Sequence, residues 1–288
     1  MIIEELEIAN SPEYFQAGDY LSKKEYVLFG NDKTIIRNGN ILKTELPFKI
    51  SMPQITIIDN TSFLISEYDT HSSNLTAKSK NAWLIDEKGK ILSHFNIGHA
   101  YKIVSTEKFI IASYARSDFY RGVSSEFEVG GFAVFDFKGN CLFHFDHVDA
   151  IFPKQMKFID IKAMSIFDNN KVHFLTYPNF DILKLDLNNF KLDVELQLNV
   201  DKTNVDDEFW NPKAISKFGS EWFFLTPHGE TNESIIFKRG EDNKVVKIGS
   251  CNYSPFPKGL LNGKFLIPSF SIDETAKKCQ IVKCKYAA

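Results

Sequence analysis

A short apolar motif, rich in Phe, Leu and Ile and ending in small polar or aromatic residues, recurs along the chain. Its copies are Phe63–Tyr68, Phe109–Tyr114, His173–Tyr177, Phe223–Pro227 and Phe265–Phe270. They lie roughly 40 to 60 residues apart, which is the period of a repeating supersecondary unit. The pattern therefore predicts an array of similar units rather than a fold with one irregular core.

Each copy is preceded by a short apolar run and a turn of polar residues, the pattern of a β-hairpin. A loop of variable length follows, and then a third apolar run, a second tight turn and a fourth run. The second hairpin is clearest in Ala82–Leu92 and in Ala133–Leu142, where Asp and Gly suit a tight turn. Each unit is therefore expected to contain four antiparallel strands.

Four antiparallel strands in a repeated unit describe the blade of a β-propeller. We expect the all-β fold class: a single six-bladed β-propeller of four-stranded antiparallel blades, in one domain over residues 1–288. Five or seven blades are the alternatives. The last segment lacks a fourth strand, so Ile2–Ile8 is expected to join the last blade and close the ring. The expected blades are about 12–48, 49–98, 99–147, 148–200, 201–250 and 251–288 plus 1–11.

The repeated apolar motif and the Asp-x-x-Gly-x-x-Leu hairpin resemble those of six-bladed β-propellers in general, and the resemblance covers nearly the whole chain. The Trp-Asp and Gly-His signature of WD40 repeats and the double glycine of kelch repeats are absent. Six-bladed propellers include lactonases, sialidases, glycan-processing enzymes, scaffolds and binding proteins. The resemblance therefore implies an architecture and no particular activity.

Composition narrows the class of partner. Hydrophobic residues make up 43% of the 288 residues, which is enough for a sizeable core, and the 27 Phe fall mainly in the strand-like runs. The net charge is -3 and no basic run stands out, so a nucleic-acid partner is not expected. No secretory leader and no membrane-length apolar run is visible. We expect a cytoplasmic protein without a membrane partner, whose four cysteines are buried or half-buried free thiols.

The long loops are expected on one face of the propeller, and functional residues concentrate on long loops held by a rigid scaffold. These loops are Asp69–Lys80, Ala115–Gly130, His147–Phe158 and Asp201–Trp210. In the second loop, Arg116, Asp118, Tyr120 and Arg121 suit a protein interface, because Arg and aromatic residues are frequent in interface hot spots. The alternative is a self-packed loop in which Asp118 pairs with an arginine. Trp210 ends an acidic run that could bind a basic partner or remain solvated.

The first strand of each blade is expected to begin on the same face, near the axis. When the blades are aligned on the repeated apolar motif, the residues near the starts of these first strands are Gln16, Gln54, His99, Lys162, Lys213 and Lys258. A small residue, Ala or Gly, follows each of the three lysines, which suits strands that pack closely near the axis. Converging lysines would attract a carboxylate, a phosphate or an acidic side chain. The alternative is that these polar side chains only line a wet channel.

Signatures of metal sites and of enzymes are weak in this sequence. His144 and Asp146 share one strand face while His147 lies beyond it, so a third ligand is missing and no metal is expected. His173 lies within a strand and is expected to be structural. Nucleophile elbows, zinc-helix motifs and phosphate-binding loops are absent, and Gln, His and Lys are poor ligands for calcium. No cofactor is expected.

Two hypotheses follow from this pattern. The first is a non-enzymatic protein-binding propeller, a scaffold or an inhibitor, for which an immunity protein is one concrete version. Its contacts would be the loop residues and the lysines. The second is an enzyme for a small anionic substrate, with His99 as general acid or base and the three lysines stabilising negative charge.

Overall fold

The computed structural model places a core of strands joined by turns. It describes residues 2–7, 15–22, 25–30, 34–46, 50, 53–68, 80–114, 131–145, 160–168, 170–198, 209, 211–228, 233–239, 244–252, 258–260, 264–268 and 278–283. These residues contain no helix of the length and apolarity that a membrane crossing needs. The structure divides into two compact units, residues 9–160 and residues 161–288 with 1–8, and each is described by itself.

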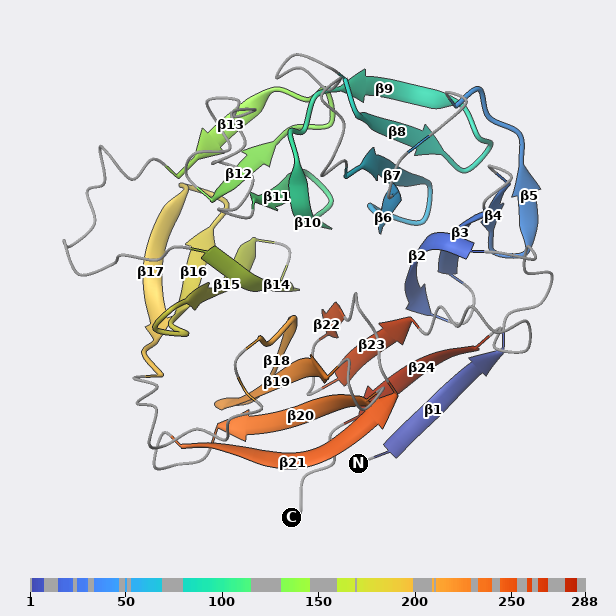
Figure 1. Ribbon diagram of the computed structural model, residues 1–288. Helices are drawn as coiled ribbons and strands as arrows, with labels where there is room; N and C mark the ends of the chain where they lie inside the picture. Colours follow the sequence, from blue (N-terminus) through green and yellow to red (C-terminus); the bar gives the residue numbers. More distant parts are fainter. Residues whose placement is uncertain are drawn as a thin grey trace. The chain divides into compact units, whose positions relative to one another are not determined.

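The unit formed by residues 9–160 holds three four-stranded sheets, each made of consecutive strands in antiparallel order (Figure 1). In each sheet we call the first strand the inner strand and the fourth the outer strand. Strand β6 contacts β2 and β3 of the preceding sheet and β10 of the following one. The strands are β2 (Phe15–Ser22), β3 (Glu25–Gly30), β4 (Ile35–Arg37), β5 (Asn40–Leu42), β6 (Pro53–Ile57), β7 (Ser62–Glu67), β8 (Ala82–Asp86), β9 (Ile91–Phe95), β10 (Ala100–Ser105), β11 (Ile110–Tyr114), β12 (Phe132–Phe135) and β13 (Cys141–His144).

The other unit also holds three four-stranded sheets. Two consist of consecutive strands, and the third combines three strands from the end of the chain with β1, which pairs with β24 from Ile2↔Lys283 to Glu7↔Lys278. The strands are β1 (Ile2–Glu7), β14 (Asp160–Asp168), β15 (Lys171–Tyr177), β16 (Ile182–Asp186), β17 (Lys191–Leu196), β18 (Ala214–Phe218), β19 (Glu221–His228), β20 (Glu233–Arg239), β21 (Val245–Asn252), β22 (Lys258–Leu260), β23 (Lys264–Pro268) and β24 (Lys278–Lys283).

The structure shows an all-β fold of the β-propeller type with four-stranded antiparallel blades. The expectation of six blades is corrected. Among the described residues, five sheets are blades of four consecutive strands, and the remaining sheet is a composite of the two chain ends. The pairing of the N-terminal strand with the last strand is confirmed.

Local chemistry explains the hairpins that the sequence predicted. The Asp86 carboxylate accepts hydrogen bonds from the backbone N–H groups of Lys88 and Lys90, both at 2.9 Å. Asp136 repeats this arrangement with Lys138 at 2.9 Å and Asn140 at 2.8 Å. Gly89 and Gly139 then adopt φ angles of 87° and 86°, a region that side-chain-bearing residues rarely enter. The Asp-x-x-Gly sequence therefore determines this turn locally.

Phenylalanine fills the space between neighbouring sheets. The two faces of a strand alternate, and in the central strands of a blade both faces are covered by adjacent sheets, so these strands are almost continuously apolar. Strand β11, for example, is buried at all five positions. The largest fully buried side chains include Phe29, Phe63, Phe132, Phe135, Phe174, Phe180, Phe209, Phe223, Phe224, Phe237 and Phe265.

Candidate binding site on the inner strands

Ser165 joins three inner strands in the unit that contains residues 161–288. Its hydroxyl, on β14, donates a hydrogen bond to the Ile215 carbonyl on β18 at 2.9 Å and lies 3.5 Å from the Gly259 carbonyl on β22. A Cβ atom on Gly259 would collide with the Ile215 carbonyl, so these backbones approach too closely for any larger residue. The expected crowding of small residues on the inner strands is confirmed here.

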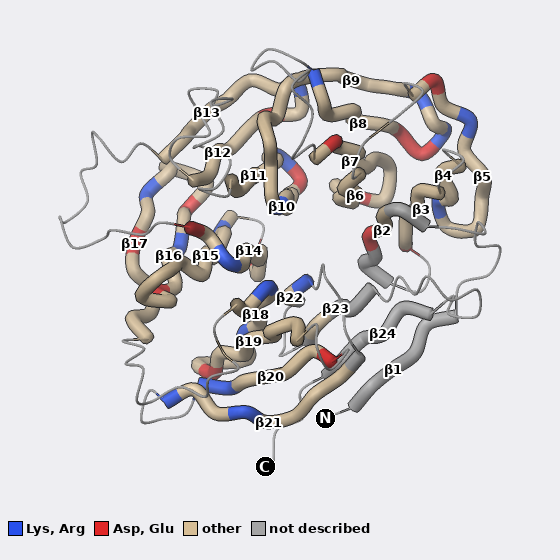
Figure 2. The backbone as a smooth tube through the Cα atoms, viewed as in Figure 1, with Lys and Arg blue, Asp and Glu red and all other residues tan. Residues whose placement is uncertain are grey.

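Lys162, Lys213 and Lys258 flank this contact: Lys162 lies on β14, Lys258 lies on β22, and Lys213 directly precedes β18. Each lies at most three residues along the chain from the groups that Ser165 joins. At roughly 3.3 Å per residue, each lysine Cα is therefore within about 10 Å of the contact. Figure 2 shows the positive residues on β14, beside β18 and on β22. All three lysines are half-buried. We call them the lysine row.

Tyr177 supports one member of the row. It is the last residue of β15, and the Lys162 ammonium lies 4.8 Å from the centre of its ring. A cation over an aromatic face is attracted electrostatically. Three residues further on, Phe180 packs against Tyr177 with ring centroids 5.7 Å apart. The end of β15 thus gives Lys162 a fixed apolar platform.

The other inner-strand candidates lie in the unit formed by residues 9–160. The side-chain amide of Gln54 donates to the carbonyls of Ala100 at 2.8 Å and Tyr101 at 3.2 Å, so it links β6 to β10. His99 is half-buried and directly precedes β10. Gln16 lies on β2, and its side chain is outside the described residues. The structure gives Gln54 a role in joining two blades.

The loop candidates are outside the described part of the chain. This applies to Arg116, Asp118, Tyr120, Arg121 and Trp210, and also to Asp146 and His147. Their proposed roles stay predictions. His144 is exposed on β13. Of the two cysteines whose side chains are described, Cys251 is buried as expected, whereas Cys141 is exposed on an outer strand, so the expectation of burial was wrong there.

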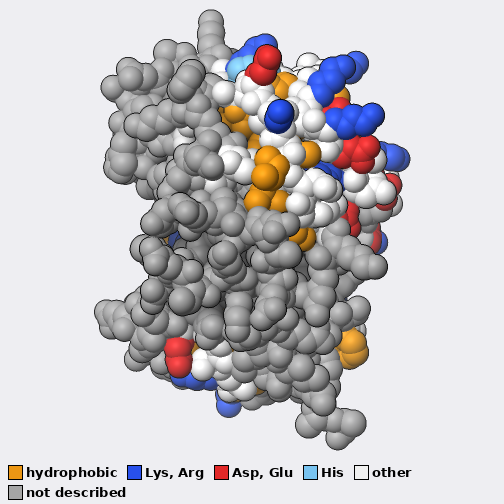
Figure 3. Space-filling model, turned by 90° about the vertical axis from the view of Figure 1, so that its right-hand side faces the viewer, with side chains coloured by type: hydrophobic (Ala, Val, Ile, Leu, Met, Phe, Trp, Pro, Cys, Tyr) orange, Lys and Arg blue, Asp and Glu red, His pale blue; other side chains and the backbone are white. Residues whose placement is uncertain are grey.

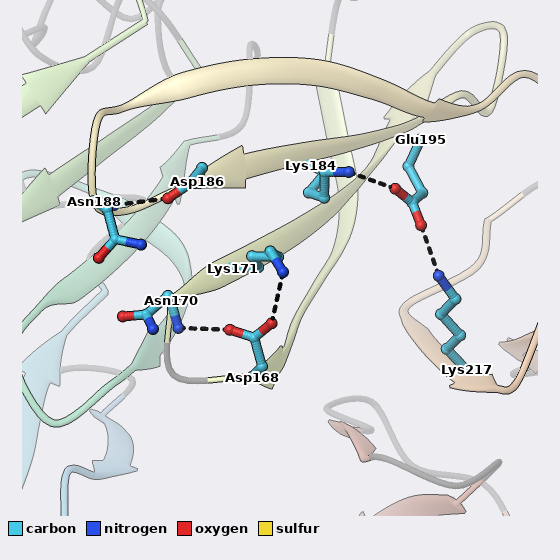
Figure 4. Close-up of polar contacts among 8 residues, drawn as sticks. All are labelled: Asp168, Asn170, Lys171, Lys184, Asp186, Asn188, Glu195 and Lys217. Atoms are coloured by element: carbon cyan, nitrogen blue, oxygen red, sulfur yellow. Dashed lines mark hydrogen bonds and ion pairs between the residues drawn. The ribbon is translucent and has the colours of Figure 1, made fainter.

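A second polar cluster, which the sequence analysis did not predict, lies between the sheet of β14–β17 and the sheet of β18–β21 (Figure 4). Glu195 on β17 binds two ammonium groups, that of Lys184 at 2.8 Å and that of Lys217 at 2.6 Å. Hydrogen bonds from both lysines hold the pKa of Glu195 at about 2. Lys217 also lies over the ring of Trp222 at 4.8 Å. Strand alternation alone cannot show such a cluster, because its members come from different sheets.

Glu195 reaches this position because it is the extra residue of a β-bulge. Ile182 pairs with Leu196 and Leu183 pairs with Val194, which leaves Glu195 without a partner across the ladder. A bulge redirects a side chain and bends its strand. The outer strand thereby turns a carboxylate toward the next blade.

In the unit formed by residues 9–160, the described exposed apolar side chains form no second candidate site. On the face seen in Figure 3, the described hydrophobic side chains lie in small groups beside polar and charged ones. Among the described residues of the 9–160 unit, the large exposed ones are Ile41 on β5, Leu92 on β9 and Leu142 on β13, one for each outer strand. Isolated apolar residues of this kind are ordinary protein surface.

Comparison with known proteins gives the fold and no family. No protein-family model matches the chain, and no curated protein resembles it. Among solved structures, a putative exported protein from Bacteroides fragilis has a TM-score of 0.55 at 9% identity, covering 99% of this chain and 95% of that one. Identity this low indicates a shared fold alone.

Two lyases are also similar in structure. A virginiamycin B lyase from Staphylococcus aureus, with quinupristin, has a TM-score of 0.48 at 14% identity, covering 99% of both chains. A streptogramin B lyase has a TM-score of 0.49 at 10% identity, covering 97% of this chain and 96% of that one. A TM-score below 0.5 establishes neither a common fold nor a common activity.

Proposed function

We propose that this protein is a non-enzymatic binding propeller that grips an acidic surface of a protein partner. The supporting observation is the lysine row: three half-buried lysines on, or directly before, three inner strands, each within three residues of the backbone contact made by Ser165. Three cations in one small region create a positive potential that attracts carboxylates. Rigid neighbouring strands reduce the entropy lost when the partner binds.

The rigid environment of the row argues for binding rather than for a solvated surface. Lys162 is stacked on Tyr177, and Gly259 and Ser165 fix the spacing of the strands. On this proposal, Arg116, Asp118, Tyr120, Arg121 and Trp210 provide further contacts from the loops. The enzyme hypothesis assigns the general acid or base to His99, which directly precedes β10, and it is the alternative to this proposal.

The proposal is tested with a defined acidic probe. A fluorescein-labelled ten-residue glutamate peptide is titrated with wild-type protein and with the Lys162→Gln/Lys213→Gln/Lys258→Gln variant, and anisotropy reports binding. The matched control carries Lys88→Gln/Lys90→Gln/Lys138→Gln, which removes the same charge from exposed hairpin turns. We expect the row variant to bind at least tenfold more weakly and the control to bind as wild type does. Equal losses in both variants would show that only net charge matters and would refute the proposal.

The partner itself is then sought with the same three proteins as baits in native lysate. The proposed partner is a protein that wild type and the control variant retain and that the row variant loses. A protein retained by all three baits would bind elsewhere on the surface. If His99→Ala abolished the conversion of a small anionic metabolite, the enzyme hypothesis would replace this one.

A further inference from the structure

His173 occupies a closed aromatic site at a junction between two blades. It lies on β15 with a side chain only 5% exposed. Its ring centre is 5.0 Å from that of Phe167 on β14 and 5.5 Å from that of Trp222 on β19 of the next sheet. Within the described structure, its Nδ1 atom is buried and has no hydrogen-bond partner. The site accepts an uncharged imidazole as an apolar plate and, within the described structure, offers a protonated Nδ1 no acceptor.

Charged groups on β14, β16, β17 and β18 act on this site. Among the acids, Glu195 on β17 has the largest effect on the pKa of His173, and it is shared between Lys184 on β16 and Lys217 on β18. On β14, Asp168 is paired with Lys171 of β15 at 3.2 Å. Around His173, one carboxylate and one aromatic stack therefore join the blade of β14–β17 to the blade of β18–β21, in addition to the Ser165 hydrogen bond and the hydrophobic core that the two blades share.

The neutral form of His173 fits this site much better than the charged form. Burial lowers the pKa of His173 from 6.5 to about 4, and Lys217 and Lys184 act in the same direction against the attraction of Glu195 and Asp168. The folded site thus binds a proton roughly 300-fold more weakly than an exposed imidazole does. Conversely, protonation must disfavour this packed arrangement by the same factor.

We propose that the junction between these two blades is an acid-operated joint, in which protonation of His173 draws the Glu195 carboxylate away from Lys217. The imidazolium needs an acceptor, and Glu195 is the carboxylate that already contacts both blades. Once Glu195 turns toward His173, Lys217 loses its ion pair. Two cations, the Lys217 ammonium and the His173 imidazolium, then lie against the Trp222 ring. The contact between β17 and β18 is then lost while each blade keeps its own strand pairing.

Trp222 reports directly on the proton of His173. In protein labelled with 15N-tryptophan, the Trp222 indole signal is assigned with Trp222→Phe and followed from pH 7 to pH 3.5. We expect it to titrate with a midpoint between pH 3.5 and 5, and to be constant in His173→Phe. The control is His144→Phe, which removes an exposed histidine and should keep the wild-type titration. A Trp222 signal that stays constant in wild type, or that titrates unchanged in His173→Phe, would overturn the proposal.

Opening of the joint is measured separately, by hydrogen exchange at pH 6.5 and pH 4 corrected for the intrinsic rates. Amides of β18 should exchange at least tenfold faster at the lower pH in wild type, with far-UV circular dichroism unchanged, and should not do so in His173→Phe. Equal protection at both pH values would mean that the proton binds without opening the joint. If His173→Phe does not fold, 15N-histidine spectra of the wild-type protein provide the test. A titration midpoint of His173 above pH 6 would refute the proposal.

Discussion

Glu195 accepts a hydrogen bond from Lys217 of the next blade at 2.6 Å while it holds Lys184 of its own blade at 2.8 Å. The Glu195 side chain is 21% exposed, and those of the two lysines are 29% and 27% exposed. An ion pair in such a partly desolvated position is stronger than one on the open surface. One carboxylate therefore joins two sheets that follow one another along the chain.

Glu195→Gln should weaken this junction. The amide cannot compensate two ammonium groups, and we expect the free energy of unfolding to fall by about 1–3 kcal/mol. The measurement is urea unfolding at pH 7. Asp193→Asn is the control, because Asp193 pairs with Lys191 on the exposed surface and should change the stability by less than about 0.5 kcal/mol. Similar losses in both variants would show that Glu195 does not act as a bridge.

Acid should destabilise the protein in two steps. His173 has a lowered pKa in the folded state, so the stability that its neutral form provides is complete above pH 6.5 and is lost as the pH falls toward 4. Glu195 also has a lowered pKa, so its contribution is complete above pH 4.5 and is lost as the pH falls toward 2. Unfolding free energies measured at each pH should show that His173→Phe flattens the first step and Glu195→Gln the second. Curves parallel to wild type for both variants would contradict this assignment.

The hairpin glycine Gly139 should tolerate no side chain. Its φ is +86°, and a Cβ atom there would overlap the Phe95 side chain of the preceding blade. We expect Gly139→Ala to cost about 2–4 kcal/mol, measured by thermal and urea unfolding. Gly219→Ala is the matched control: Gly219 also has a positive φ, +57°, but its Cβ position is open. The control should cost only about 1 kcal/mol. Equal costs would mean that backbone strain alone, without the inter-blade contact, explains the glycine.

The contact between the inner strands can be tested at Ser165 and Gly259. Ser165→Ala removes the hydrogen bond to the buried Ile215 carbonyl and should cost about 1–3 kcal/mol. Gly259→Ala forces the backbones of β18 and β22 apart and should cost more. Both variants should also weaken binding of the acidic probe, because they disturb the spacing of the lysine row. Unfolding curves and anisotropy titrations on the same samples separate the two effects.

Local sequence patterns determined the elements of this fold. Alternation and turn spacing predicted four antiparallel strands per unit, because each hairpin is specified within about ten residues. Asp86 with Gly89 and Asp136 with Gly139 form the turns that their sequences indicate. The pairing of Ile2–Glu7 with the last strand also followed from the sequence, since a unit of three strands leaves an open edge.

Contacts between blades were not predictable in the same way. The alignment identified Lys162, Lys213 and Lys258 as equivalent positions, but only the structure shows the Ser165 contact that brings their strands together. The alignment also assigned Gln54 to a possible site, whereas in the structure the Gln54 side-chain amide joins β6 to β10 by a hydrogen bond. The expectation of six blades was wrong: a repeat period indicates that similar strand units recur, but it does not determine how many of the sheets are blades of four consecutive strands, and five of them are.

The sequence by itself determined strand order, hairpin geometry and the position of the small residues on the inner strands, since these depend on residues close together in the chain. The tertiary structure alone decided that the extra residue of a bulge points Glu195 at Lys217, 22 residues away, and that Trp222 covers His173. These relationships depend on the lateral packing of separate sheets, where burial and a shared ion pair set the charge state of each group.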